Sequence, residues 1–248
     1  MTDVAGFAEW MSFLERRHLA DLTFQEVSRA LRALSSTYVE RRGRLPEGAA
    51  LTGAGKRAAF ALFYAPLHFL LIRHIVTSVP ELGRIDTALV DLGCGIGASG
   101  AAWGSACDSE AVVHGIDRHP WAVDEARETY RIFGLRGRVR VEDLARITLP
   151  ERSAVVAAFA VNELNAAIRD RLLPRLLSHA EHGGRVLVVE PLAGFVAPWW
   201  PTWERAFQSS GGRANEWRAR VPLPAIVEKL DKAAGLNHRE LTGRSLWL

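Results

Sequence analysis

The 248-residue chain is poor in cysteine and in lysine. Cys94 and Cys107 are its only cysteines, so neither a disulfide framework nor a cysteine-based metal site can be built. Its only lysines are Lys56, Lys229 and Lys232, so the formal net charge of +3 comes from arginine. An excess of positive charge this small permits a nucleic-acid partner but does not indicate one.

The sequence also lacks a long uninterrupted apolar run. Its longest apolar stretch, residues 58–71, is interrupted by Pro66 and His68, and we expect it to be too short to span a bilayer. The N-terminus carries Asp3 and Glu9 and shows no apolar core followed by a cleavage site, so it does not resemble a signal peptide. We therefore expect a cytoplasmic protein without a membrane partner.

The central motif of the chain is a glycine-rich stretch. The short apolar run of residues 88–92 contains an acid, Asp91, and is followed by Gly93, Gly95 and Gly97 at alternate positions and then by a helical segment. Glycine permits a sharp turn in which backbone N–H groups come close to a ligand. The pattern predicts a strand, a loop and a helix N-terminus that hold a nucleotide-like molecule.

The identity of this ligand depends on Asp91. The spacing of Gly93, Gly95 and Ala98 also fits the dinucleotide fingerprint, but an acid beside the loop suits a cation better than a pyrophosphate. S-adenosylmethionine carries an ammonium group, and an Asp about 4 Å from an ammonium contributes on the order of 4 kcal/mol at an effective dielectric near 20. We expect Asp91 to meet this ammonium. If this carboxylate turned away from the cleft, or if the protein's own side chains filled the cleft, the assignment as an enzyme would fail and only the fold class would stand.

Two further acidic positions follow the next predicted strands. Asp117 follows the strand at residues 111–116 and lies 20 residues beyond Gly97, where the hydroxyls of a ribose are expected. Asp143 follows a short strand at residues 139–141. Strands and helices alternate in this half of the chain, which predicts a doubly wound sheet.

With these motifs the sequence resembles the class I S-adenosylmethionine-dependent methyltransferases, from about Asp86 to the C-terminus. The resemblance implies an α/β fold with a Rossmann-like, mostly parallel sheet and an N-terminal helical cap. It implies S-adenosyl-L-methionine as the cofactor, with Asp143 next to the adenine and Phe159 next to the methionine moiety. The predicted cofactor-binding residues are Asp91, Gly93, Cys94, Gly95, Gly97, Asp117, Arg118, Asp143, Leu144 and Phe159.

The chain is predicted to consist of a helical cap, residues 1–80, and a nucleotide-binding domain, residues 81–248. In the cap, Thr23 and Glu26 can form a capping box. A third helical stretch at residues 56–77 is expected to kink or split at Pro66. By resemblance, the cap should lie over the donor site and shape the acceptor pocket.

The segment after the fifth predicted strand does not alternate regularly. Residues 192–221 are rich in tryptophan, and we expect them to form a lid on the acceptor side, although the tryptophans can equally seal the core against the cap. Residues 236–241 and 245–248 are expected to pair as two closing strands, joined by a turn at Thr242, Gly243 and Arg244.

Methyl transfer from a sulfonium requires alignment more than it requires a strong base. If the acceptor must lose a proton, the candidate catalytic residues are Glu163, Glu190, His68 and Tyr64. Core packing remains open for Tyr64 and His68, and a charge that satisfies a helix N-terminus remains open for Glu163. We expect no metal.

The sequence thus predicts a methyltransferase that acts on a small-molecule acceptor by direct displacement. The alternative is a ribosome-associated or RNA-binding protein of the same fold, with or without catalytic activity. Residues 38–44, 162–164 and 189–191 resemble the methyltransferase-like family linked to assembly of the small mitochondrial ribosomal subunit, although the cysteine-rich iron–sulfur segment of that family is absent. An NAD-dependent oxidoreductase is a third interpretation, which Asp91 disfavours.

Overall fold

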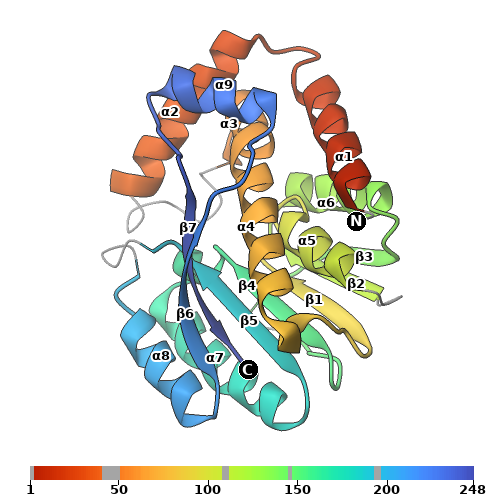
Figure 1. The fold of residues 1–248 in the computed structure, drawn as a ribbon, viewed down its shortest axis with the longest axis vertical. Coiled ribbons are helices and arrows are strands. Elements are labelled where there is room, and N and C mark those ends of the chain that lie inside the picture. The colour runs from red at the N-terminus through yellow and green to blue at the C-terminus, as the bar shows by residue number, and fades with distance from the viewer. Residues whose placement is uncertain (1–2, 41–50, 108–111, 145–146, 193–196) are drawn as a thin grey trace.

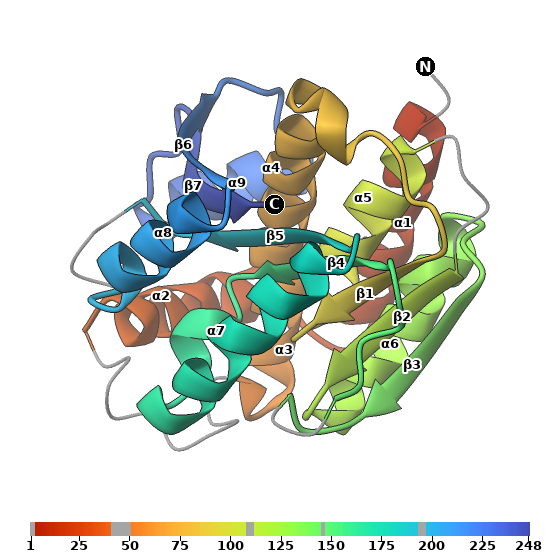
Figure 2. The same ribbon diagram turned by 90° about the horizontal axis from the view of Figure 1, so that it is seen from below.

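The computed structural model describes residues 3–40, 51–107, 112–144, 147–192 and 197–248. At its centre is a seven-stranded sheet in the order β3-β2-β1-β4-β5-β7-β6 (Figure 1). Strands β3 and β6 lie at opposite ends of this sheet (Figure 2). The predicted α/β fold with a mostly parallel sheet is confirmed.

The first five strands are parallel to one another, and the last two form antiparallel pairs, β7 with β5 and β6 with β7. The parallel strands are β1 (Ala88–Leu92), β2 (Val112–Asp117), β3 (Gly137–Val141), β4 (Ala154–Ala158) and β5 (Arg185–Glu190). The antiparallel strands are β6 (Arg213–Ala219) and β7 (Leu241–Trp247). Strands β1 and β4 are buried along their whole length, as expected for central strands covered on both faces.

Helices cover both faces of the sheet because successive side chains of a strand point to opposite faces. In β1, Leu89 packs in the core that includes residues of α4 (Ala65–Ser78), α5 (Ala98–Ala106) and α6 (Pro120–Ile132). Val90 and Leu92 pack in a second core with residues of α7 (Ala166–Glu181) and α8 (Trp200–Ser209). Asp91 is two residues from Leu89, so its side chain points to the same face of the sheet, the face covered by α4, α5 and α6.

The first two helices attach to the outside of this arrangement. Helix α1 (Asp3–His18) lies against α6, where the Trp10 indole Nε1 donates to the Thr129 hydroxyl at 2.9 Å. Helix α2 (Phe24–Glu40) contacts α9 (Ala225–Ala234). The predicted capping box at its start is confirmed, because the Thr23 N–H donates to Glu26 Oε2 at 2.8 Å and the Glu26 N–H donates to Thr23 Oγ1 at 3.3 Å.

The third helical stretch is longer than predicted. Helix α3 (Ala54–Ala59) continues through a π-helical turn, η3 (Phe60–Tyr64), directly into α4. Pro66 cannot donate a backbone hydrogen bond, which would normally interrupt a helix. The wider π-helical turn directly before it accommodates the missing donor, so the helix continues instead of splitting there. By length and composition alone, the 25-residue helix Ala54–Ser78 is long and apolar enough to cross a membrane, which corrects the expectation that the apolar run is too short. However, 67% of its most apolar 18-residue stretch is buried inside the protein, as in the core helix of a globular protein.

The described part of the tryptophan-rich segment, residues 192 and 197–221, does not form the expected lid, and its helix does not seal the core against the N-terminal helices; residues 193–196 lie outside the described residues. Trp200, Trp203 and Phe207 of α8 are buried in the second core, so they seal the sheet face opposite the N-terminal helices. The segment then continues into the edge strand β6, which pairs with β7. The indole Nε1 of Trp199 donates to Asn162 Oδ1 at 2.9 Å, and this bond ties the segment to the turn after β4.

The expected pair of closing strands is also wrong. Residues 241–247 form one continuous strand, β7, which runs through Gly243 between β5 and β6. A Cβ at Gly243 would lie 2.8 Å from Leu71 Cδ2 of α4, so this glycine provides room for a helix and does not mark a turn.

The boundary at residue 80 remains a prediction. Described residues on both sides of it share one hydrophobic core. Residues 38–44 are among those that resemble the family linked to assembly of the small mitochondrial ribosomal subunit. Residues 41–44 of this segment lie outside the described residues.

Candidate active site at the carboxyl ends of the parallel strands

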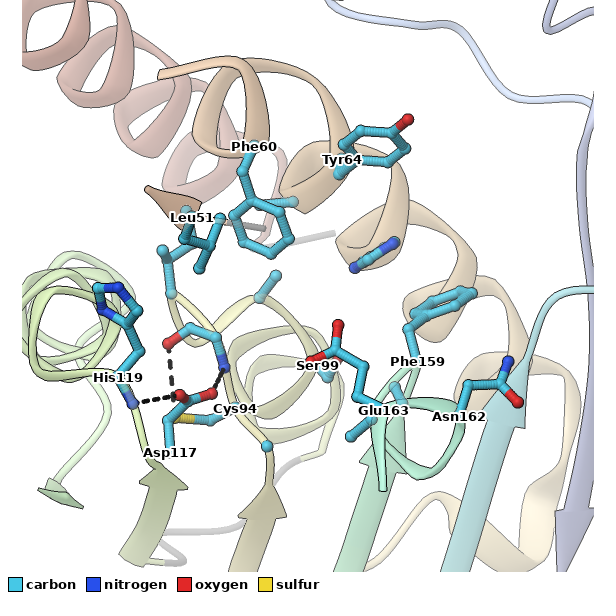
Figure 3. Close-up of a pocket in the computed structure, with 18 of the residues that line it drawn as sticks. Leu51, Phe60, Tyr64, Cys94, Ser99, Asp117, His119, Phe159, Asn162 and Glu163 are labelled. Carbon is cyan, nitrogen blue, oxygen red and sulfur yellow. Dashed lines mark hydrogen bonds between the residues drawn. The ribbon is translucent and has the colours of Figure 1, made fainter. Parts of the chain in front are cut away.

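A cavity of about 560 Å³ opens at the carboxyl ends of the parallel strands (Figure 3). Its walls come from the loops that follow β1, β2, β3 and β4, and from η3 and α4 above them. Doubly wound sheets bind their ligands at this edge.

The glycine loop forms the floor of the cavity. Gly93 and Gly95 have positive φ angles of 66° and 52° and both line the cavity. The N–H groups of Gly93 and Cys94 donate to the Ile116 carbonyl at 2.8 and 3.0 Å, which ties the loop to β2. A Cβ at Gly93 would lie 2.5 Å from the Ala160 Cβ, so only glycine fits there.

Asp117 is held at the end of β2 with its carboxylate at the cavity wall. Oδ2 accepts from the Gly95 N–H at 2.9 Å, and Oδ1 accepts from the His119 N–H at 2.8 Å (Figure 3). Each oxygen of a carboxylate can accept more than one hydrogen bond. The backbone therefore orients Asp117 and leaves it able to accept from the two hydroxyls of a ribose.

Asp91 does not reach this cavity. Its side chain is 1% exposed, and Oδ2 accepts from the Gly100 N–H at 2.7 Å and from the Tyr130 hydroxyl at 3.0 Å. Burial raises the pKa of Asp91 to about 7. The prediction of a direct contact with the donor's ammonium is wrong. Side chains alternate between the two faces of the sheet along β1, and this alternation places the Asp91 side chain between α5 and α6. The electrostatic argument for a methyl donor over NAD is lost with it, and Asp91 no longer supports the assignment as an enzyme. The other condition for that assignment is met, because the cleft beside the glycine loop is open.

Two other observations disfavour a dinucleotide. Dinucleotide-binding sheets of the Rossmann type have six parallel strands, whereas here the antiparallel β7 lies next to β5. Glu190, which ends β5 on the side where a second nucleotide would bind, is fully buried, and its Oε1 accepts from the Asn162 N–H at 3.0 Å. Glu190 does not line the cavity, so its predicted role as a base is not supported; it positions the turn after β4 instead.

The opposite side of the cavity is aromatic. His68 of α4 stacks on Phe159 with ring centroids 3.8 Å apart and an interplanar angle of 15°. Phe159 directly follows β4 with a φ of 58°, which is uncommon for a side chain of this size. Tyr64 lies one helical turn before His68, with ring centroids 6.3 Å apart. The structure therefore brings the predicted residues Tyr64, His68 and Phe159 to one wall.

The two sides of the cavity are linked by an ion pair. Arg118 follows β2 and Glu163 follows β4, and a guanidinium nitrogen of Arg118 lies 3.8 Å from Glu163 Oε2. Both side chains are partly exposed and line the cavity. The Cys94 thiol also lines it, and burial raises the pKa of this thiol well above its usual value.

The predicted residues thus divide into two groups. Those that line the cavity are Tyr64, His68, Gly93, Cys94, Gly95, Asp117, Arg118, Asp143, Leu144, Phe159 and Glu163. Those that do not are Asp91, Gly97 and Glu190. Within the described part of the chain, no group of three or more His, Cys, Asp or Glu side chains could hold a metal ion.

Sequence reasoning missed one polar pair at the cavity. His238 lines the cavity, and its Nδ1 lies 2.5 Å from Asp231 Oδ1. The His238 N–H also donates to Asp231 Oδ2 at 3.0 Å. The two residues are seven apart across the end of α9, a spacing that carries no motif.

Comparisons with known proteins agree with this geometry. Residues 89–184 match the family model described as a methyltransferase domain. Over 107 residues the chain is 33% identical to aklanonic acid methyltransferase DauC from Streptomyces sp. (strain C5), a match that covers 42% of this chain and 48% of that protein. The chain therefore spans about half the length of the curated relative it matches.

A solved structure shares the fold over most of the chain. It is a candidate O-methyltransferase from Nostoc punctiforme PCC 73102, with a TM-score of 0.53 and 14% identity, covering 90% of this chain and 69% of that one. At this level of identity the likeness concerns the fold alone.

Proposed function

We propose that this chain, whose residues 89–184 match a methyltransferase domain, is a class I methyltransferase that transfers a methyl group from S-adenosylmethionine to a small-molecule acceptor. The observation that carries the proposal is one continuous cavity with two unlike sides. The side formed by the glycine loop and Asp117 suits a nucleoside. The side formed by Tyr64, His68 and Phe159 suits an apolar acceptor.

The residues at the first side fit the proposed donor. The glycine loop leaves no room for side chains where a nucleoside must approach the backbone, and the oriented Asp117 carboxylate can accept from a ribose. Asp143 and Leu144 after β3 line the cavity, and we propose that they contact the adenine. When bound, S-adenosylmethionine supplies a methyl group on a positively charged sulfur.

The chain's own residues then have to align the acceptor and exclude water. Alignment of two reactants can supply roughly 7 to 11 kcal/mol of a barrier, so a strong base is not required. For an acceptor hydroxyl, we propose His68 as the group that takes the proton, because its ring is held by stacking on Phe159 at the cavity wall.

The acceptor class follows from the lining of the second side. Leu67, Leu71 and Leu241 line the cavity together with Tyr64 and His68, a composition that suits a mostly apolar molecule with one hydroxyl or carboxyl group. The curated relative is named for a small organic acid, aklanonic acid, which supports an acceptor of this class.

Calorimetric titration tests the donor side. We expect S-adenosylmethionine and S-adenosylhomocysteine to bind the purified protein at one site, because both carry the nucleoside that the glycine loop and Asp117 would hold. NADH, tested in parallel by its fluorescence, should not bind. Folded protein that binds neither adenosyl ligand would refute the proposal.

A further inference from the structure

The buried position of Asp91 leaves open which group would meet the ammonium of the donor. The question rests on the proposed function, since S-adenosylmethionine carries an α-amino-acid tail with one ammonium group. Within the described residues, four acidic side chains line the cavity: Asp117, Glu142, Asp143 and Glu163.

The strand order separates these four acids into two groups. Strand β1, with its glycine loop, lies between β2 and β4. Asp117 follows β2, and Glu142 and Asp143 follow β3 on the same side of the loop, whereas Glu163 follows β4 on the other side. Because neighbouring strands are about 4.8 Å apart, β2 and β4 are separated by about 10 Å. A ligand whose ribose lies at Asp117 and whose chain crosses the loop would therefore place its tail near Glu163.

The Glu163 side chain lies at the cavity, where such a contact would form. It extends from the turn after β4 into the cavity (Figure 3) and is half exposed, with a relative exposure of 50%. Its ion pair with Arg118 has an N···O distance of 3.8 Å, longer than a hydrogen bond. Pairs of this kind contribute little to stability, so a ligand ammonium can replace the guanidinium at small cost.

We propose that Glu163 binds the ammonium of the donor's amino-acid tail, in place of Asp91. A direct contact between a carboxylate and an ammonium is a charge-assisted hydrogen bond, about twice as strong as a neutral one. This assigns Glu163 to donor binding rather than to proton removal from the acceptor. It also explains how the cavity accommodates a cationic tail although the acid of the glycine motif faces the opposite direction.

Two ligands distinguish the tail from the nucleoside. S-adenosylhomocysteine carries the amino-acid tail, whereas 5′-methylthioadenosine has the same nucleoside and sulfur without it. We expect Glu163→Gln to weaken S-adenosylhomocysteine binding at least tenfold by calorimetry and to change 5′-methylthioadenosine binding less than twofold. Glu128→Gln is a matched control, because Glu128 pairs with Arg131 on α6 at 2.8 Å and does not line the cavity. It should leave both affinities unchanged.

The outcomes separate this inference from the proposed function. If the wild-type protein binds neither ligand, the proposed function fails and the inference fails with it. If the wild type binds both and Glu163→Gln binds S-adenosylhomocysteine as tightly, the inference is overturned while the function stands. Equal weakening of both ligands, with an unchanged melting temperature, would also overturn it, because the effect would then not be specific to the tail.

Discussion

The carboxyl ends of β1 and β2 each carry an aspartate, and the two aspartates have opposite environments. Asp91 is buried between helices, whereas Asp117 lines the cavity. The parallel register pairs Asp91 with Gly115, so Asp117 lies two residues further along and one step beyond the last pair of β1 and β2. A shift of two residues along a strand therefore separates an acid that supports the scaffold from one that can meet a ligand.

The two carboxylates also differ in what holds them. Asp91 connects β1 to α5 and α6 through Gly100 and Tyr130, and both bonds reach a single oxygen. Asp117 accepts one backbone N–H on each oxygen, and both bonds come from loops that line the cavity. We therefore expect changes at the end of β1 to affect stability and changes at the end of β2 to affect ligand binding.

The largest effect should be the pH dependence of the Asp91→Asn variant. The folded-state pKa of Asp91 is raised from 3.8 to about 7, so its stabilising contribution is complete below pH 3.8 and is lost as the pH rises through 7. Each pKa unit corresponds to about 1.4 kcal/mol, and the loss is therefore roughly 4 kcal/mol. An asparagine does not ionise and its carbonyl can still accept from Gly100.

Urea unfolding at pH 4 and pH 8 measures this effect. The free energy of unfolding of Asp91→Asn, relative to wild type, should rise by up to about 4 kcal/mol between the two pH values. A difference between the two proteins that stays constant with pH would show that Asp91 is not held in the buried, desolvated state described above.

An intermediate effect is expected for Gly100→Ala. In a helix interior this change normally stabilises by about 1 kcal/mol. Here the new Cβ would lie 2.7 Å from both Asp91 Oδ2 and the Tyr130 hydroxyl, so we expect a loss of about 2 to 3 kcal/mol in the free energy of unfolding. Gly104→Ala in the same helix is the control, because its nearest atoms are Leu135 methyl groups at 3.2 Å. Similar melting temperatures for the two variants would contradict this account of β1.

The smallest effect should be that of Asp117→Asn, and it should appear in ligand binding. The amide keeps one carbonyl for the Gly95 or His119 N–H but loses the second acceptor and the charge. We expect about tenfold weaker binding of both S-adenosylhomocysteine and 5′-methylthioadenosine, which corresponds to about 1.4 kcal/mol. Calorimetry with both ligands measures it. Unchanged affinities would mean that the ribose does not lie at Asp117.

Local patterns predicted a large part of this arrangement. The glycine loop, the strand before Asp117 and the capping box at Thr23 involve residues within a few positions of one another, and all three are found in the structure. The arrangements that were missed join distant parts of the chain. Gly243 was interpreted as a turn because nothing near it in sequence shows that Leu71 packs against it.

The amino-acid sequence by itself determined the order of the five parallel strands and of the helices between them, the loop that only glycine can form, and the acid placed at the end of β2. These depend on local backbone preferences and on the period of apolar side chains, which can be read from neighbouring residues. Only the tertiary structure decided that Asp91 faces α5 and α6 and that Glu163 lines the cavity. Which face a side chain occupies depends on where its strand ends relative to its partners, and that register is set by contacts between segments far apart in the chain.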